Sequence, residues 1–347
     1  MPNWYCSRED VKDAASIRGA SQNSTIDTII EAESRAIDNA LSRFFIPKTA
    51  TKTFHWPPSN NYNPTALYLN DWLISVTTLK TKAQDSSPTT ISSNDFFLEP
   101  NNVGPPYTRL EIDLSSSSSF DAGDTPQRSI EIIGSWGYNA DTKSTGTVAS
   151  GLSSSASATS FTCSDGSLVD VGDTLLIESE QLFVSARSNA QVGSEALTGS
   201  VAALQSTVTV PVTTGSNWSV GEIIQVNSEK MLIESISSNN LTVQRAYDGS
   251  VLAAHSSSDQ VHGFRVLTVQ RAINGTTAAT HANATAISVY TIPQDVRLLA
   301  IRSAISTFYQ IESGDSRAVA DDLGRYRDMV LHSYGTGRLK PVKVGAI

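Results

Sequence analysis

A six-residue motif, LTVQRA, occurs twice in this chain, at 241–246 and at 267–272, and it constrains the fold more than any other feature. A front half is repeated as well, as VGDTLLIESEQLFVS from Val171 and VGEIIQVNSEKMLIES from Val220. The two front halves are spaced more widely than the two LTVQRA copies. The second copy must therefore lie inside the first.

The repeat also predicts local structure. In the inner copy, the apolar run 231–236 reaches Leu241 through the polar turn 237–240, which is typical of a tight β-hairpin. In the outer copy, the same hairpin is opened between Arg187 and Arg265, and its tip holds the whole inner copy. Loop tips tolerate such insertions because their ends already lie close together. We therefore predict two nested β modules. The outer module is expected at 155–187 with 265–287, and the inner module at 200–262.

Helical patterns flank the modules on both sides. A capping box at Ser7 opens a short helix, and a longer apolar periodicity follows over 26–44. Near the other end, Pro293 opens a third helix and a fourth is expected over 316–334. Between these helix pairs lie six strand-like runs, at 49–56, 66–69, 73–80, 95–99, 108–114 and 129–133.

The stretch 134–160 is rich in Gly, Ser, Ala and Thr, so a flexible linker into the β modules is expected there. The predicted fold class is α+β: a helical body with a small antiparallel β region, split by an all-β insertion of two nested small β modules. The insertion is expected to behave as a passenger of the body. The predicted domains are the first part of the body at 1–140, the β insertion at 141–287, and the C-terminal helices and tail at 288–347.

Composition excludes several classes of function. The formal charge is −9, and an acidic surface does not hold nucleic acid by neutralising phosphates, although DNA could pass it without sticking. Two cysteines, Cys6 and Cys163, do not make a disulfide framework, which fits assembly in a reducing cytoplasm. No signal peptide is expected from the opening MPNWYCSRED. No run approaches the apolar length of a membrane span.

The search for catalytic or metal-binding motifs finds only weak candidates. His255 and His281 are repeat equivalents, which favours a structural role in each module, such as bonding a turn carbonyl, over a shared metal site. Glu180 and Glu229 are also equivalents beside polar hairpin tips, and a pair of carboxylates is the residue type that glycosidases need. Repeat symmetry explains them better.

Two further groups have simpler explanations. The acids of the segment 165–173 lack the spacing of a calcium loop and are expected to be turn residues; they are Asp165, Asp170 and Asp173. The tryptophans of the first segment could stack sugars or bases, but core or interface packing is favoured; they are Trp4, Trp56, Trp72 and Trp136. We therefore predict no catalytic residue, no metal and no cofactor.

Six segments outside the insertion carry a family resemblance. They are EDVK at 9–12, the helix at 26–45, LYLNDWLISVTTL at 67–79, FFLEPNN at 96–102, IEIIGSWGY at 130–138 and IPQDVRLLAIRSAISTFY at 292–309. Together they resemble the head-to-tail connector, or adaptor, proteins of tailed bacteriophages. In that family a segment like GSWGY runs almost directly into a helix like IPQDV, whereas here the β insertion separates the two.

The resemblance implies a structural virion protein without enzyme activity. Such proteins form a ring, here expected to have twelve copies, that joins the portal protein to the tail or to a tail-terminator or stopper protein. The ring leaves a channel for the genome, without specific DNA binding, and is assembled in the host cytoplasm. The C-terminal helix and tail of the family dock into the portal. The residues this implies are Arg325, Arg327, Tyr334, Arg338, Leu339, Lys340 and Lys343.

Alternatives from other classes stay open at this point. The basic C-terminal residues could simply be solvated charges at a helix end. The β insertion could be the head of a receptor-binding or glycan-binding fibre protein, which would form trimers. A wall-degrading hydrolase would need a cleft with tuned carboxylates, for which the chain offers few candidates.

Overall fold

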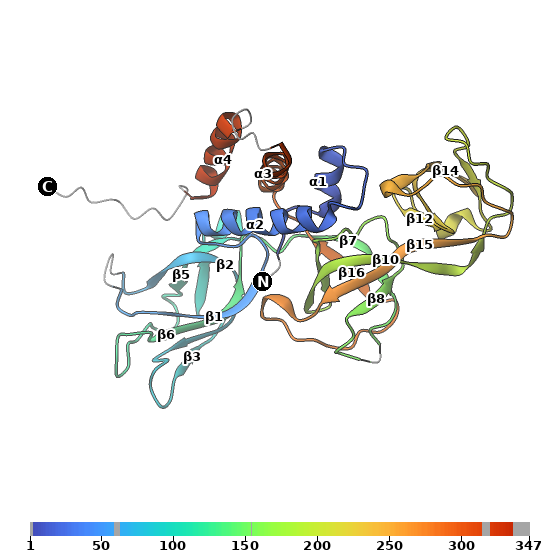
Figure 1. Cartoon of the computed structure of the whole chain (residues 1–347). Helices are drawn as coiled ribbons and strands as arrows, with labels where there is room; N and C mark the ends of the chain where they lie inside the picture. The colour runs from blue at the N-terminus through green and yellow to red at the C-terminus, as the bar shows by residue number, and fades with distance from the viewer. Residues whose placement is uncertain (1–2, 59–62, 154, 314–319, 336–347) are drawn as a thin grey trace. The chain divides into compact units, whose positions relative to one another are not determined.

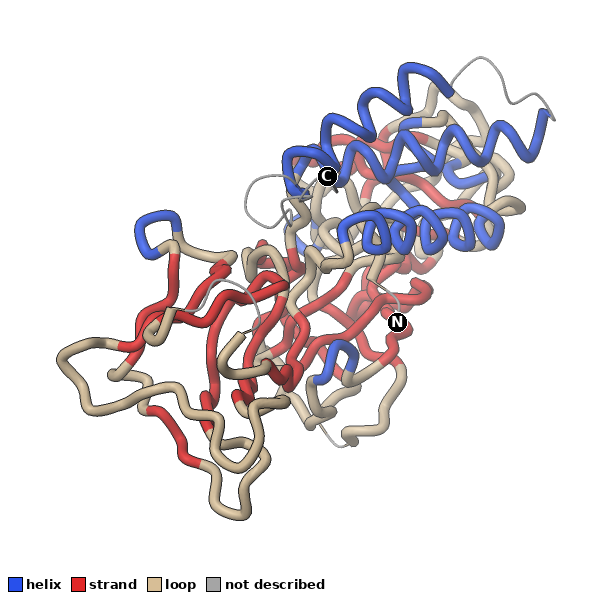
Figure 2. The backbone as a smooth tube through the Cα atoms, turned by 90° about the vertical axis from the view of Figure 1, so that its left-hand side faces the viewer, coloured by secondary structure: helices blue, strands red, loops and turns tan. Residues whose placement is uncertain are grey.

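A computed structural model describes residues 3–58, 63–153, 155–313 and 320–335. Four α-helices lie among these residues: α1 (Arg8–Ala14), α2 (Asn23–Leu41), α3 (Gln294–Ser313) and α4 (Ala320–Gly335). The other long elements are β-strands, and they form two antiparallel sheets (Figure 2). None of the described helices combines the length and the apolar character needed to cross a membrane.

The chain divides into two compact units, each built from separated segments. Unit 1 comprises 1–35, 142–273 and 277–324, and unit 2 comprises 36–141, 274–276 and 325–347. The helices α2 and α4 each contribute residues to both units. The domain boundaries expected from the sequence stay a prediction, and each unit is described below by itself.

Unit 2 is organised around a six-stranded antiparallel sheet. Its strands are β1 (Lys48–Phe54), β2 (Ala66–Thr81), β3 (Thr89–Ile91), β4 (Phe96–Glu99), β5 (Tyr107–Ile112) and β6 (Ile130–Trp136). They run in the order β1-β6-β2-β5-β4, and β3 pairs with β2. The two runs expected at 66–69 and 73–80 are one long strand, β2, whose pairing shifts register at several points.

The core of unit 2 corrects the predicted fold class. Its buried apolar cluster runs from Trp56 to Trp136 and consists entirely of strand and loop residues, with no member from a helix. A body whose core is made by a sheet is not a helical body, so that prediction is wrong. The protein is mostly β, because the strand-like runs of the first segment pair into a sheet large enough to bury its own core.

Unit 1 contains a ten-stranded antiparallel sheet. Its strands are β7 (Thr142–Ser150), β8 (Ser160–Cys163), β9 (Thr174–Ile177), β10 (Glu180–Ala196), β11 (Thr209–Pro211), β12 (Ile223–Val226), β13 (Glu229–Ser237), β14 (Asn240–Gln244), β15 (Gln260–Gln270) and β16 (Ala286–Tyr290). The path runs β10-β9-β16-β7-β8-β15-β12-β13-β14-β11, and β15 pairs back onto β10, so the first six strands close on themselves. Two separate apolar cores result, one within the closed strands and one around β12–β14.

The nesting inferred from the repeat is confirmed at the level of single residue pairs. In the outer copy Arg187 pairs with Leu267, and in the inner copy the equivalent Ile236 pairs with Leu241. Both ladders also carry a bulge at the same place, after Val184 in one and after Ile233 in the other. The predicted inner hairpin is β13 and β14, and in the outer copy β10 and β15 run on side by side toward the inner module (Figure 1).

The linker expected at 134–160 is wrong over most of its length. Residues 142–150 form β7, which lies between β16 and β8 in the sheet. Thr145 and Val148 of this strand are buried. Because strands pair with both edges of β7, its small residues form a regular strand without large apolar side chains. Thr142 pairs with Tyr290, and the two ends of the β insertion therefore lie next to each other.

The helices of unit 1 join segments from opposite ends of the sequence. The capping box predicted at Ser7 is present, with Asp10 as its partner. Asp10 also accepts two hydrogen bonds from Arg297 of α3, at 2.6 and 3.0 Å. The Tyr309 hydroxyl donates to the carbonyl of Ala15 at 3.2 Å. The expectation that the opening helices fold together with the helix after Pro293 is confirmed.

Candidate interaction sites

An aromatic cluster in unit 2 borders a cavity of about 360 Å³. The rings are Phe45, Trp72, Tyr138 and Tyr334, with centroid separations between 5.0 and 6.2 Å and mostly edge-to-face geometry. We call this site the aromatic cavity. The residues that line it are Arg43, Trp72, Val103, Gly104, Pro106, Thr108, Tyr138, Ser333 and Tyr334.

The local sequence explains why these rings meet. Ser42 takes a left-handed backbone conformation after the last residue of α2, which turns Arg43 and Phe45 away from the helix axis. On the other side, Gly137 donates its backbone N–H to the carbonyl of Trp72. A side chain at Gly137 would lie 3.0 Å from the Ile46 carbonyl oxygen, so glycine is required there.

Arg43 forms the charged end of the aromatic cavity. Its side chain is buried, with 9% of the residue exposed, and its guanidinium lies 5.0 Å from the centre of the Trp72 ring. Burial lowers the pKa of Arg43, against the opposing effect of Asp71. Within the described part of the chain the guanidinium donates no hydrogen bond. The carboxylate of the nearby Asp71 accepts from Lys52 and from the backbone N–H of Trp72.

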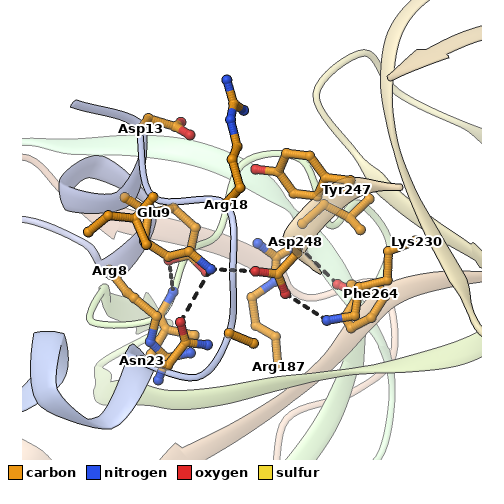
Figure 3. A pocket seen from close by; sticks show the side chains of 15 residues that line it. Arg8, Glu9, Asp13, Arg18, Asn23, Arg187, Lys230, Tyr247, Asp248 and Phe264 are labelled. Atoms are coloured by element: carbon orange, nitrogen blue, oxygen red, sulfur yellow. Dashed lines mark hydrogen bonds and ion pairs between the residues drawn. The ribbon is translucent and has the colours of Figure 1, made fainter. Parts of the chain in front are cut away.

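A second site lies in unit 1, where α1 meets the β modules (Figure 3). This cleft holds about 130 Å³. Arg8 donates its backbone N–H to the carbonyl of Val171 at 3.0 Å, and the Val171 N–H donates to the Glu9 carboxylate at 3.1 Å. Asp248 bonds both Lys12 and Lys230 (Figure 3). The β insertion is therefore anchored to α1 and is not the independent passenger expected from the sequence.

The carboxylates at this junction have unusual proton affinities. Burial, together with the charge of Asp170, raises the pKa of Glu9 to about 7, although Arg187 and Arg8 act in the opposite direction. Burial also raises the pKa of Asp170, and it raises that of Asp173 well above its ordinary value. The sequence predicted that Asp170 and Asp173 are turn residues, but no pattern in it indicated that α1 would place Glu9 beside them.

Asp165 behaves as the turn residue that was predicted. Its Oδ1 accepts hydrogen bonds from the backbone N–H of Ser167, at 2.8 Å, and from the Ser167 hydroxyl, at 2.7 Å. Its other oxygen accepts from the Ser219 hydroxyl at 2.7 Å. Burial acts to raise the pKa of Asp165, but these hydrogen bonds lower it.

The repeated glutamates lie at the centre of a buried network in each module. In the inner module, Glu229 accepts hydrogen bonds from Arg245 at 2.7 and 2.8 Å and from two backbone N–H groups, and it bonds His255 Nε2 at 2.8 Å. Burial acts to raise the pKa of Glu229, but the bonds from Arg245, a backbone N–H and His255 lower it to about 2.

The outer module repeats this network residue for residue. Glu180 accepts two hydrogen bonds from Arg271, both at 2.6 Å, and bonds His281 Nε2 at 2.8 Å. The two histidines thus have equivalent structural places, although their partner is a carboxylate and not a turn carbonyl. Both glutamate side chains are fully buried, so neither carboxylate is open to a substrate.

The two cysteines are buried thiols. Burial raises the pKa of Cys6, and it raises that of Cys163 to about 11. Neither thiol is ionised at neutral pH, so neither is activated as a nucleophile.

The residues predicted to dock a partner have mixed placements. Arg325 and Arg327 lie on α4 and are exposed, whereas Tyr334 belongs to the aromatic cavity. Four more lie outside the described residues: Arg338, Leu339, Lys340 and Lys343. Sequence reasoning identified the aromatic positions Trp72 and Tyr138 through motifs but did not predict a cavity, and no sequence signal pointed to Arg43.

Comparison with known proteins adds one weak similarity. No protein-family model matches the chain, and no curated protein matches it. One similar solved structure is a chain of the "Neck of empty GTA particle computed with C6 symmetry", with 16% identity and a TM-score of 0.28. The match covers 39% of this chain and 66% of that chain, which is just under two thirds of its length. A TM-score this low does not establish a shared fold.

Proposed function

We propose that the protein is a structural component of a bacteriophage neck and has no enzyme activity. In this proposal, twelve copies form a ring that joins the portal protein to the tail or to a tail-terminator or stopper protein. The channel of the ring lets the genome pass without specific binding. The protein is assembled in the host cytoplasm and resides in the virion.

The observation that carries the proposal is the contact between the opening and closing helices. The motifs that resemble connector proteins lie before and after the β insertion, and the resemblance requires these parts to fold together. Arg297 and Asp10 meet across almost the whole sequence, and Thr307 donates to Glu33 at 2.8 Å. The paired strands β7 and β16 give the insertion adjacent ends, which is what an insertion into a connector body requires.

The docking surface for the portal is proposed on α4 and the segment that follows it. Arg325 and Arg327 are exposed and have charges suited to acidic groups or carbonyls. Tyr334 contributes a ring at the end of this helix. The proposal extends to Arg338, Leu339, Lys340 and Lys343.

The test is to measure the molar mass of the purified protein with and without the portal protein of the same virus. We expect a monomer or weak oligomer alone and a closed ring when the portal is added, because the partner completes the contacts. The variant Arg325→Glu/Arg327→Glu should weaken assembly. Stable trimers under both conditions would favour the receptor-binding alternative and refute the ring.

A further inference from the structure

The aromatic cavity of unit 2 combines three properties that a packed core does not have. It holds about 360 Å³ of space. Its walls are the rings of Trp72, Tyr138 and Tyr334. It also contains the guanidinium of Arg43, a residue with 9% of its surface exposed, and this group donates no hydrogen bond to the described residues.

The guanidinium has no acceptor among the described residues, and its nitrogens are not among the fully enclosed unpaired atoms, so they open onto the cavity and its water. Mostly buried arginines normally pair with carboxylates, whose charge-assisted hydrogen bonds are stronger than neutral ones. Stacking on Trp72 satisfies none of the five N–H donors. An acceptor that replaces this water must come from outside these residues.

The chemistry of the site selects the ligand. A guanidinium presents a planar fork that matches a carboxylate. The neighbouring rings, with Pro106 and the exposed Val103 at the rim, suit an aromatic or aliphatic side chain. Nucleic acid would need several cations along a phosphate backbone, and one buried guanidinium in an acidic protein does not supply them. Cavities of a few hundred cubic ångströms hold one or two side chains.

We propose that the aromatic cavity binds a peptide segment of a partner protein in which an Asp or Glu stands next to an aromatic or aliphatic residue. The carboxylate pairs with Arg43, and the adjacent side chain packs among Trp72, Tyr138 and Tyr334. This inference concerns a pocket for a side chain, so it does not depend on whether the protein forms a ring.

Two matched peptide pools test the proposal on the full chain. One pool contains acetylated, amidated pentapeptides with a central Glu beside Phe, Tyr, Trp or Leu, and the other contains the same peptides with Gln. Binding is followed through the indole N–H signal of Trp72 in a ¹⁵N-tryptophan NMR spectrum. We expect a saturable shift with the Glu pool and at least about tenfold weaker binding of the Gln pool, because a charge-assisted pair is lost.

Protein variants sharpen the test. Arg43→Gln should weaken binding of the Glu pool by about tenfold or more. Arg43→Lys should bind this pool with an affinity between those of Arg43→Gln and the wild type, because lysine keeps the charge but loses the planar guanidinium. Arg128→Gln is the matched control, since this exposed arginine of the same unit does not line the cavity. Circular dichroism and thermal unfolding establish that each variant is folded.

Three outcomes would overturn the proposal. They are the absence of any Trp72 shift with the Glu pool, equal binding of the two pools, and unchanged binding by a folded Arg43→Gln variant. Should Arg43→Gln fail to fold, the comparison of the two pools on the wild-type protein still decides. A failed ring assay would leave these results unaffected.

Discussion

The outer and inner β modules have the same buried network but different surroundings. Both contain a glutamate held by an arginine, a histidine and two backbone N–H groups, and both pair their strands in the same register. The inner arginine, Arg245, donates to the carbonyls of Ala202, Thr207 and Ala253, whereas Arg271 donates to those of Ala158 and Ala279. The shared network is thus the structural core of the repeat, and the differences show where each copy has adapted.

The largest expected effect comes from removing the central arginine. Arg245→Leu leaves Glu229 buried without its counter-charge, so we expect a loss of about 3–5 kcal/mol from the unfolding free energy of the inner module. Arg271→Leu should cost the outer module less, because Arg271 bonds one carbonyl fewer. Hydrogen exchange of the amides in β13 and in β10 measures the two effects separately. Equal losses would show that the additional carbonyl bond of Arg245 contributes nothing.

A pH change should affect the junction of α1 with the outer module and leave the inner module unchanged. The pKa of Glu9 is raised from 4.5 to about 7 in the folded protein, so the folded state binds more protons than the unfolded state between these values. Stability therefore falls as the pH rises through this window, and we expect a gain of about 2 kcal/mol at this junction on going from pH 7 to pH 5.

The variant Glu9→Gln isolates the group responsible. It keeps an oxygen for the N–H of Val171 and should remove the part of the pH dependence that comes from Glu9, leaving the part that comes from Asp170 and Asp173, whose pKa values are also raised. The inner module provides the contrast, because the pKa of Glu229 is lowered from 4.5 to about 2. Its contribution is present above pH 4.5 and is lost only as the pH falls toward 2. A wild-type unfolding free energy that does not change between pH 5 and 7 would contradict the role of Glu9.

A smaller effect is expected from making the inner turn resemble the outer one. Asp248→Asn copies the residue that the outer repeat has at position 274 and keeps a side chain tolerant of the left-handed backbone. It removes the carboxylate charge shared by the buried Lys12 and the partly exposed Lys230 but keeps a carbonyl oxygen that can accept from one of them, so a loss of about 1 kcal/mol is expected. Thermal unfolding measures the loss. The double variant Asp248→Asn/Lys12→Met should lose little more than the single one.

The smallest effect concerns the second ring nitrogen of each histidine. His281 Nδ1 lies 2.8 Å from Glu178, whereas His255 Nδ1 lies 3.5 Å from Asn227. The Glu178 side chain is 60% exposed, so Glu178→Ala should cost less than about 1 kcal/mol. Asn227→Ala should cost somewhat more, because Asn227 also donates to Asp259 at 2.9 Å and asparagine favours the left-handed backbone that both positions adopt. Urea unfolding of both variants measures the difference, and an equal or larger loss at Glu178 would contradict it.

The β modules could be predicted from the sequence better than the rest of the chain. An internal repeat shows which residues are equivalent, so the nested arrangement could be inferred from the spacing of the repeats alone. The observed pairing of Arg187 with Leu267 agrees with it. The strands of unit 2 are not repeated, so the sequence offers no second copy with which to align them. Each is identifiable as a strand, but nothing in the local pattern shows that they join one sheet and bury Trp56 with Trp136.

The candidate sites were harder to predict for a physical reason. A cavity depends on what several separate segments leave unfilled, and Arg43, Trp72 and Tyr334 are far apart in sequence. The raised pKa of Glu9 likewise arises from residues more than a hundred positions away. In contrast, Asp165 bonds Ser167 in its own turn, and its role as a turn residue could be predicted because this partner is a neighbour in the sequence.

The nested hairpin has a consequence for how such a chain can grow. The inner module ends in an intact turn of its own between β13 and β14, with Ser238 in a left-handed conformation. In the inner copy, that turn stands at the position where the outer copy holds the whole inner module. A third copy inserted at this turn would leave the strand pairs of both existing modules unchanged. A chain of this architecture can therefore grow by successive insertions at the tip of its innermost hairpin.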